Sequence, residues 1–166
     1  SQGIAALPGQ VSVQGGTATF SVNTGLRMIV SAPISGGAID QEQGTGTLQV
    51  SGKQALTAVT VGDGTLDVDA CPSLGANVPI IFAGGTLQVR DQPSLTVGSL
   101  MASIAGNSIS LDLGNATLTA ALGLSTASTL FVSGTGPAAK LVVGGSIALQ
   151  QPAAIHDDTA DVEFAT

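Results

Sequence analysis

Short segments in which apolar and polar residues alternate recur along most of the chain. In each of them every second residue is apolar, so an extended strand would turn one face inward and the other toward solvent. Glycine or asparagine occupies nearly all the gaps, as turns between strands require. The pattern therefore predicts strands at residues 11–13, 17–22, 47–51, 65–69, 86–90, 110–113 and 129–133.

Two segments have enough alanine and leucine to be read as helix, namely residues 99–105 and 116–127. The second is rich in threonine and is interrupted by Gly123. Threonine favours strands and glycine weakens helices. We therefore predict a strand in the second segment as well.

One five-residue phrase, Gly-Thr-Leu-x-Val, occurs three times, at residues 46–50, 64–68 and 85–89. Its leucines, Leu48, Leu66 and Leu87, are separated by 18 and 21 residues. One coil of a β-solenoid takes roughly 18–25 residues, and a single coil cannot bury its own apolar residues. The repeat therefore predicts that the three leucines lie over one another in successive coils.

The predicted fold is an all-β, right-handed parallel β-helix, or β-solenoid, that forms one domain over residues 1–166. The alternative is an antiparallel β-sandwich like a pilus subunit, which also has short strands at regular intervals. A sandwich does not predict the same phrase at coil-length spacing. Within the domain, residues 1–10 are a candidate docking arm and residues 151–166 form an acidic C-terminal segment.

Longer repeating units surround this phrase. The first unit begins with Ile-Ser-Gly-Gly at residues 34–37, continues through GTGTLQVSG at 44–52 and closes with VTVGDGTL at 59–66. The second unit runs from LTVGSL at 95–100 to LDLGNATL at 111–118. These units resemble the stacked coils of autotransporter passenger domains, the exported part of type V secretion proteins. The resemblance covers roughly residues 30–150 and implies a β-helix that is exported, with no catalytic residues attached to it. Alternating strands like those of a C-terminal barrel are not seen in this sequence.

Composition agrees with a stacked core and excludes some partners. Aromatic residues make up 2% of the chain, with no Trp or Tyr, while aliphatic residues that can pile up in ladders are abundant. The net charge is −7 and only four residues are basic, so we expect no nucleic-acid partner. No apolar run is long enough for a transmembrane helix, and the first residues lack the basic region and apolar core of a signal peptide, so for an exported protein we expect a signal that was removed or lies outside this sequence.

Candidate chemistry is sparse. The densest group of polar ligands contains the single histidine, and its candidate metal ligands are His156, Asp157, Asp158 and Asp161. The spacing of a calcium loop is missing, so we expect a solvated acidic segment and neither a metal site nor a cofactor. The single cysteine, Cys71, can form no internal disulfide, and its role stays open.

Carboxylates on the strands suggest one enzymatic alternative. Asp67 and Asp69 are two residues apart and share a face, and Asp91 and Asp112 could align with them in later coils. Such carboxylates could act as acid and base on a polysaccharide. We favour outward acidic residues on a solvated face, because the aromatic side chains that hold sugars are scarce.

These observations predict a non-catalytic structural or adhesive module that works outside the cell or on its surface, with surface or host ligands as partners. The main alternative is a subunit of an extracellular filament joined head to tail, since a solenoid has two open ends. A carbohydrate-active β-helix enzyme is the third reading.

Overall fold

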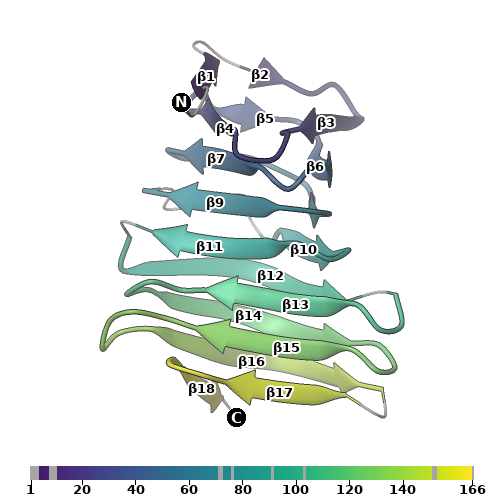
Figure 1. Cartoon of the computed structure of the whole chain (residues 1–166), viewed down its shortest axis with the longest axis vertical. Coiled ribbons are helices and arrows are strands. Elements are labelled where there is room, and N and C mark those ends of the chain that lie inside the picture. The colour runs from purple at the N-terminus through teal and green to yellow at the C-terminus, as the bar shows by residue number, and fades with distance from the viewer. Residues whose placement is uncertain are drawn as a thin grey trace.

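The computed structural model describes residues 4–7, 11–70, 73–75, 77–90, 92–102, 104–150 and 153–165. These residues form strands, turns and bends, and none of them is helical. The strands wind into a β-solenoid of about seven turns, stacked along the long axis (Figure 1). Every strand pairing within this part of the chain is parallel, so the predicted solenoid is confirmed and the antiparallel sandwich is wrong.

Each turn of the coil has three faces, which we number in chain order. The first face is an eight-stranded parallel sheet, to which every turn contributes one strand. Its strands, in spatial order, are β1 (Ile4–Leu7), β4 (Arg27–Val30), β7 (Thr47–Ser51), β9 (Thr65–Asp69), β11 (Thr86–Arg90), β13 (Ser108–Asp112), β15 (Thr129–Ser133) and β17 (Ala154–Asp157).

A second eight-stranded sheet continues around the corner between the other two faces. Its strands are β3 (Thr17–Ser21), β6 (Ala38–Gln43), β8 (Val59–Val61), β10 (Pro79–Phe82), β12 (Ser94–Ala102), β14 (Thr117–Leu124), β16 (Lys140–Leu149) and β18 (Asp161–Phe164). The register shifts within β12, β14 and β16 mark the corner, and divide each of these strands into two halves.

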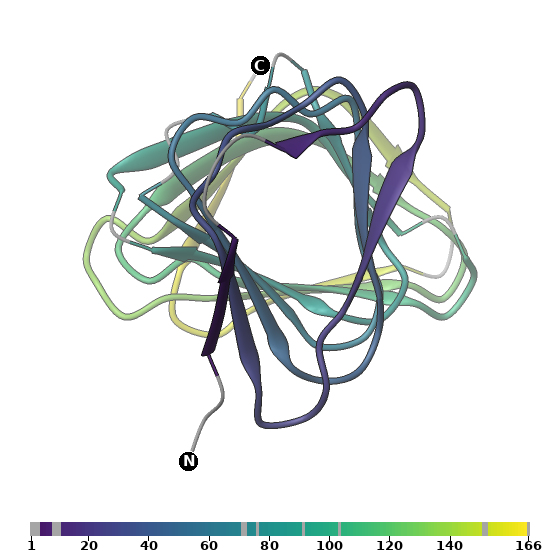
Figure 2. The same ribbon diagram turned by 90° about the horizontal axis from the view of Figure 1, so that it is seen from above.

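The second face of the coil holds the first halves of these three long strands together with β18. In the early turns it is made by the two-stranded sheet of β2 (Val11–Ser12) and β5 (Ile34–Ser35) and by hydrogen-bonded loops. The third face holds the second halves of the long strands and, in earlier turns, β3, β6, β8 and β10. Seen along the axis, the turns surround one interior (Figure 2).

The inward side chains of the first face lie over one another in register. Leu48 is the partner of Leu66, Leu66 of Leu87 and Leu87 of Leu111, and all four are buried. The predicted stacking of residues 48, 66 and 87 is therefore confirmed. Because similar side chains repeat at the spacing of the strands, branched aliphatic residues fill most of the interior, with Phe82 buried among them.

The turn before each Gly-Thr-Leu phrase depends on glycine. Gly64 has a positive φ of 83°, a conformation that favours glycine, and a Cβ atom there would lie 2.5 Å from the carbonyl oxygen of Gly46 in the preceding turn. Gly64 therefore allows the coils to approach closely at the corner where its phrase begins.

Most local predictions agree with the structure. The strands expected at residues 47–51, 65–69, 86–90 and 129–133 are β7, β9, β11 and β15. Residues 117–124, which could have been helical, form β14. Within the candidate docking arm, Ile4–Leu7 forms β1 and pairs with β4 of the same chain, while residues 1–3 and 8–10 lie outside the described residues.

The leucine ladder gives a direct test of the core. Leu66→Ala is expected to lower the free energy of unfolding by about 2–5 kcal/mol, because it leaves a cavity between Leu48 and Leu87. The matched variant Thr65→Ala, on the outward side of the same strand, is expected to cost less than about 1 kcal/mol. Chemical denaturation followed by circular dichroism measures both, and equal costs would contradict the stacked core.

Candidate functional site

Polar residues form a column on the outer side of the first face. Register places Gln49, Asp67, Gln88 and Asp112 beside one another on the four successive strands β7, β9, β11 and β13. Side chains at such positions in a parallel sheet stand one strand spacing apart and can bond directly. This polar column contains two of the carboxylates that the sequence suggested for catalysis, Asp67 and Asp112.

Arg27 joins this column from β4, the strand next to β7. Its Nε donates to Oε1 of Gln49 at 2.8 Å, and its Nη2 lies 2.6 Å from Oδ2 of Asp67. Gln49 in turn donates through Nε2 to the carboxylate of Asp69. A single guanidinium thus ties together strands β4, β7 and β9.

A second arginine contacts the same carboxylate from the other side. Nε of Arg90 lies 3.6 Å from Oδ1 of Asp67, and its Nη2 donates to Gln88. The side chain of Asp67 is 0% exposed, whereas those of Arg27 and Arg90 are 31% and 44% exposed. The two arginines therefore cover and neutralise a buried carboxylate.

This arrangement corrects the expectation of a solvated acidic face at Asp67. The residue does sit on the outward side of its strand, but the arginine side chains lie over it and exclude water. Charge pairing was not expected, because the basic residues are scattered along the sequence. Only the register of the coil brings Arg27 and Arg90 to one carboxylate.

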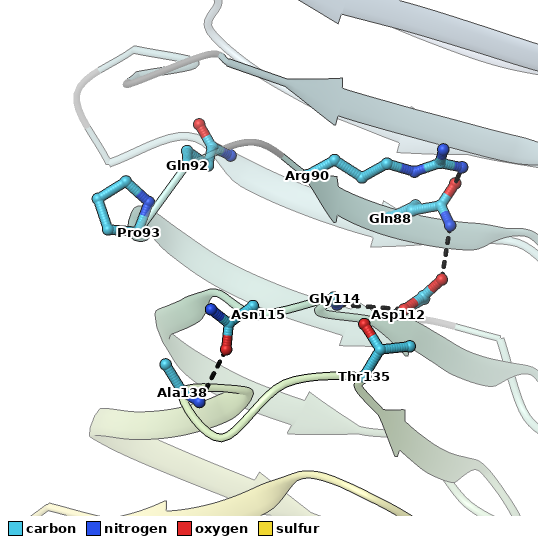
Figure 3. A pocket seen from close by; sticks show the side chains of 9 residues that line it. All are labelled: Gln88, Arg90, Gln92, Pro93, Asp112, Gly114, Asn115, Thr135 and Ala138. Atoms are coloured by element: carbon cyan, nitrogen blue, oxygen red, sulfur yellow. Dashed lines mark hydrogen bonds between the residues drawn. The ribbon is translucent and has the colours of Figure 1, made fainter.

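An open groove of about 750 Å³ lies beside this column (Figure 3). It is formed where strands β11 and β13 meet the loops that follow them, and it is lined by Gln88, Arg90, Gln92, Pro93, Asp112, Gly114, Asn115, Thr135 and Ala138. Most of these side chains carry amide, hydroxyl or charged groups. The groove can therefore offer several hydrogen bonds to a polar ligand.

The polar groups of the groove already hold its walls in place. The carboxylate of Asp112 accepts hydrogen bonds from Nε2 of Gln88 at 2.5 Å and from the amide of Gly114 at 3.2 Å. Oδ1 of Asn115 accepts from the amide of Ala138 at 3.0 Å, which orders the loop on the far wall. Figure 3 shows these three bonds among the residues that line the groove.

Among the described residues that line the groove, no pair of carboxylates is brought together as an acid–base mechanism needs. Among its described lining residues, Asp112 is the only carboxylate. Asp67 lies two strands away in the column and is buried. Asp91, which the sequence also suggested as a catalytic carboxylate, lies outside the described residues, and so does Cys71.

The candidate metal ligands occupy the last turn. His156 is on β17 and stacks on Phe131 of the turn before, with ring centroids 5.4 Å apart and planes inclined by 16°. Asp157 ends β17, Asp158 follows in the bend and Asp161 begins β18. In the part of the chain that the structure describes, no three His, Cys, Asp or Glu side chains gather closely enough to hold a metal ion.

The last turn is fastened by an exposed ion pair. Nζ of Lys140 on β16 donates to Oε2 of Glu163 on β18 at 2.6 Å. This hydrogen bond and the charge of Glu163 raise the pKa of Lys140 above its usual value. Since the raised pKa belongs to the folded state, the small contribution of the pair is complete at neutral pH and is lost only as pH rises through that pKa.

The fold, with the polar column on the outer side of its first face, defines this chain as a β-solenoid protein. No helix in the described residues has the length and apolar character needed to cross a membrane. A scan against protein-family models, a search of curated proteins and a search of solved structures find no match to this chain.

The buried carboxylate can be tested by comparing its removal with the removal of its partners. The double variant Arg27→Met/Arg90→Met is expected to cost about 3–5 kcal/mol, because it leaves a buried carboxylate without its cations. Asp67→Asn is expected to cost less, about 1–2 kcal/mol, because the partly exposed guanidinium groups that remain can reach water.

Chemical denaturation at neutral pH measures both changes. The control is Lys140→Met, which removes an exposed ion pair and is expected to shift the unfolding midpoint far less than the double arginine variant does. If the double arginine variant is as stable as the parent, the arginines do not shield Asp67.

Proposed function

We propose that this chain is a non-catalytic structural module that works outside the cell or on its surface, as a rigid spacer or adhesive stalk. The observation that carries the proposal is the single core, in which buried residues from Val22 to Ala160 form one continuous cluster through successive turns. Such a rod separates its two ends by a distance set by the number of stacked turns.

The contacts within the polar column support a structural role for its charged groups. Arg27 and Arg90 bond to Asp67, and Gln88 bonds to Asp112, so these groups tie neighbouring turns to one another. A site that hydrolyses a polysaccharide would need two accessible carboxylates, but Asp67 is buried. The groove beside the column gives the stalk a polar surface on which a surface or host ligand could be held.

The resemblance of residues 30–150 to autotransporter passenger coils supports the extracellular location. A stacked coil also needs no disulfides, because its stability comes from contacts between neighbouring turns. The low content of charged residues, 9%, is consistent with an outer surface built mainly of Ser, Thr, Gln and Asn.

The second candidate is a subunit of an extracellular filament, assembled from many copies. The observation that favours it is the exposure of apolar residues at the C-terminal end of the coil, where Ile147, Leu149 and Phe164 are 43%, 44% and 48% exposed. Exposed apolar clusters mark contact surfaces.

The absence of catalysis is tested by incubating the purified chain with anionic and neutral polysaccharides and analysing the products by chromatography. We expect no product from the parent chain or from Asp112→Asn, the variant that removes the accessible carboxylate of the groove. Product formation by the parent that is lost in Asp112→Asn would overturn the proposal in favour of a carbohydrate-active enzyme.

The location is tested in the source cells with an epitope inserted in the exposed loop at residues 135–138. We expect external protease to remove the epitope from intact cells while an internal marker protein survives. An epitope that is cleaved only after the cells are lysed would place the protein inside and contradict the proposed location.

A further inference from the structure

The groove beside the polar column has hydrogen-bonding groups that its own walls do not use. Arg90 bonds to Gln88 through Nη2 and faces Asp67 through Nε, so most of its guanidinium N–H groups remain available. Its side chain is 44% exposed. Nδ2 of Asn115 and Oγ1 of Thr135, both on exposed residues, have no hydrogen-bond partner among the described residues. These groups are free to bond to a ligand.

Donors and acceptors of the groove stand close together. Figure 3 shows Asp112 between Arg90 and Thr135, with Asn115 on the same side of the groove as Thr135. Each carboxylate oxygen of Asp112 accepts one bond, from Gln88 or from the amide of Gly114, and can accept a second. A hydroxyl group is both donor and acceptor, so neighbouring hydroxyls on one ring can bond to several of these groups at once.

The charges around the groove favour a neutral ligand. The described ionisable side chains in and beside the polar column are Arg27, Arg90, Asp67, Asp69 and Asp112, so carboxylates outnumber guanidinium groups. Both arginines already face the buried carboxylate of Asp67. A bound anion would therefore lie beside Asp112 with no spare cation to balance it.

An aromatic ring lies on the same outer surface as the groove. Phe131 is on the outward side of β15 and is 40% exposed. One face of its ring stacks on His156 of β17. On its other side is β13, where the partner of Phe131 is Ser110. A serine side chain is too short to cover a phenyl ring, so the ring face toward β13 stays open.

The open ring face and the groove are aligned along β13. Ser110 and Asp112 are both on the outward side of that strand, two residues apart, which is about 6.6 Å along a strand. Their partners on β15 are Phe131 and Ser133. A chain molecule lying along β13 would thus pass from the groove at Asp112 to the face of Phe131. One ring of an oligosaccharide spans a comparable length.

We propose that the groove binds a neutral oligosaccharide laid along β13; this ligand rests on the adhesive role proposed above and names the chemistry that the role implies. One sugar residue lies in the groove, where its hydroxyl groups bond to Asp112, Arg90 and Asn115. The next residue lies over Ser110 and stacks its C–H groups on Phe131, because the face of an aromatic ring is negative. The sugar is held without cleavage, since Asp112 is the only carboxylate among the described lining residues.

The test is a titration of the purified full chain with cellohexaose, maltohexaose, mannohexaose and hexagalacturonate, followed by heteronuclear NMR. We expect at least one neutral sugar to shift the amide signals of Gln88, Asn115 and Phe131, with a dissociation constant on the order of 0.1–1 mM. The acidic hexagalacturonate is expected to bind at least about tenfold more weakly. No saturable shift with any neutral sugar, or tighter binding of the acidic one, would overturn the proposed ligand.

Two variants test the groove and the ring separately. Asn115→Asp keeps the oxygen that accepts from Ala138 but removes the Nδ2 donors, and is expected to weaken binding about three- to tenfold. Phe131→Ala removes the stacking face and is expected to weaken binding about threefold or more. Its far-UV circular dichroism should match the parent, since Phe131 is already 40% exposed.

The matched control is Asn23→Asp, the same change in an exposed turn four strands away from β13, before β4. This variant is expected to bind like the parent. If Asn115→Asp and Phe131→Ala also bind like the parent, the sugar does not occupy the groove and the proposed site is wrong.

The ligand and the structural role fail in different ways. Absence of binding together with absence of cleavage overturns the ligand alone, whereas binding followed by cleavage supports the ligand and overturns the non-catalytic role. Two further arms identify the source of the sugar by competition with the bound hexasaccharide. Competition by polysaccharide purified from the source cells supports a surface polymer, and competition by desialylated mucin supports a host glycan.

Discussion

The structure depends on the parallel stacking of one turn on the next in strict register. Backbone hydrogen bonds between turns fix the distance, and the register then decides which side chains become neighbours. Inside the coil this produces ladders such as Leu48, Leu66, Leu87 and Leu111, which are buried because each has a like neighbour on both sides. A side chain without such a neighbour is exposed even when its strand is intact, as Ile147 shows.

The same register acts on the outer side, where its consequence is electrostatic. A charged residue on a strand of the coil has its nearest neighbours on the two strands beside it, which are far away in the sequence. Asp67 lies between Gln49 and Gln88 on the adjacent strands, and Arg27 and Arg90 reach it from above and below. A carboxylate on an outward position can thus be fully buried although it lies on the outer side of a single sheet.

The fold could be predicted from the sequence to the extent that the repeat is explicit. The phrase at residues 46–50, 64–68 and 85–89 gives the register of three turns, and the structure has those strands in the predicted alignment. The pairing of Arg27 with Asp67 could not be found in this way, because β4 carries no copy of the phrase and its alignment with β7 is visible only in the structure. The groove is likewise built by loops whose spacing varies, and whose position depends on contacts such as that of Asn115 with Ala138.

The loop that forms the far wall of the groove leaves the coil after β15 and rejoins it at β16, with strand pairing on both sides of the excursion. Its length is therefore uncoupled from the packing of the interior, since the adjoining strands are anchored by the turns above and below them. Variation in that segment can change the shape and chemistry of the groove while the rod keeps its thickness and its repeat. A scaffold of this kind separates the residues that are free to diversify from those that hold the molecule together.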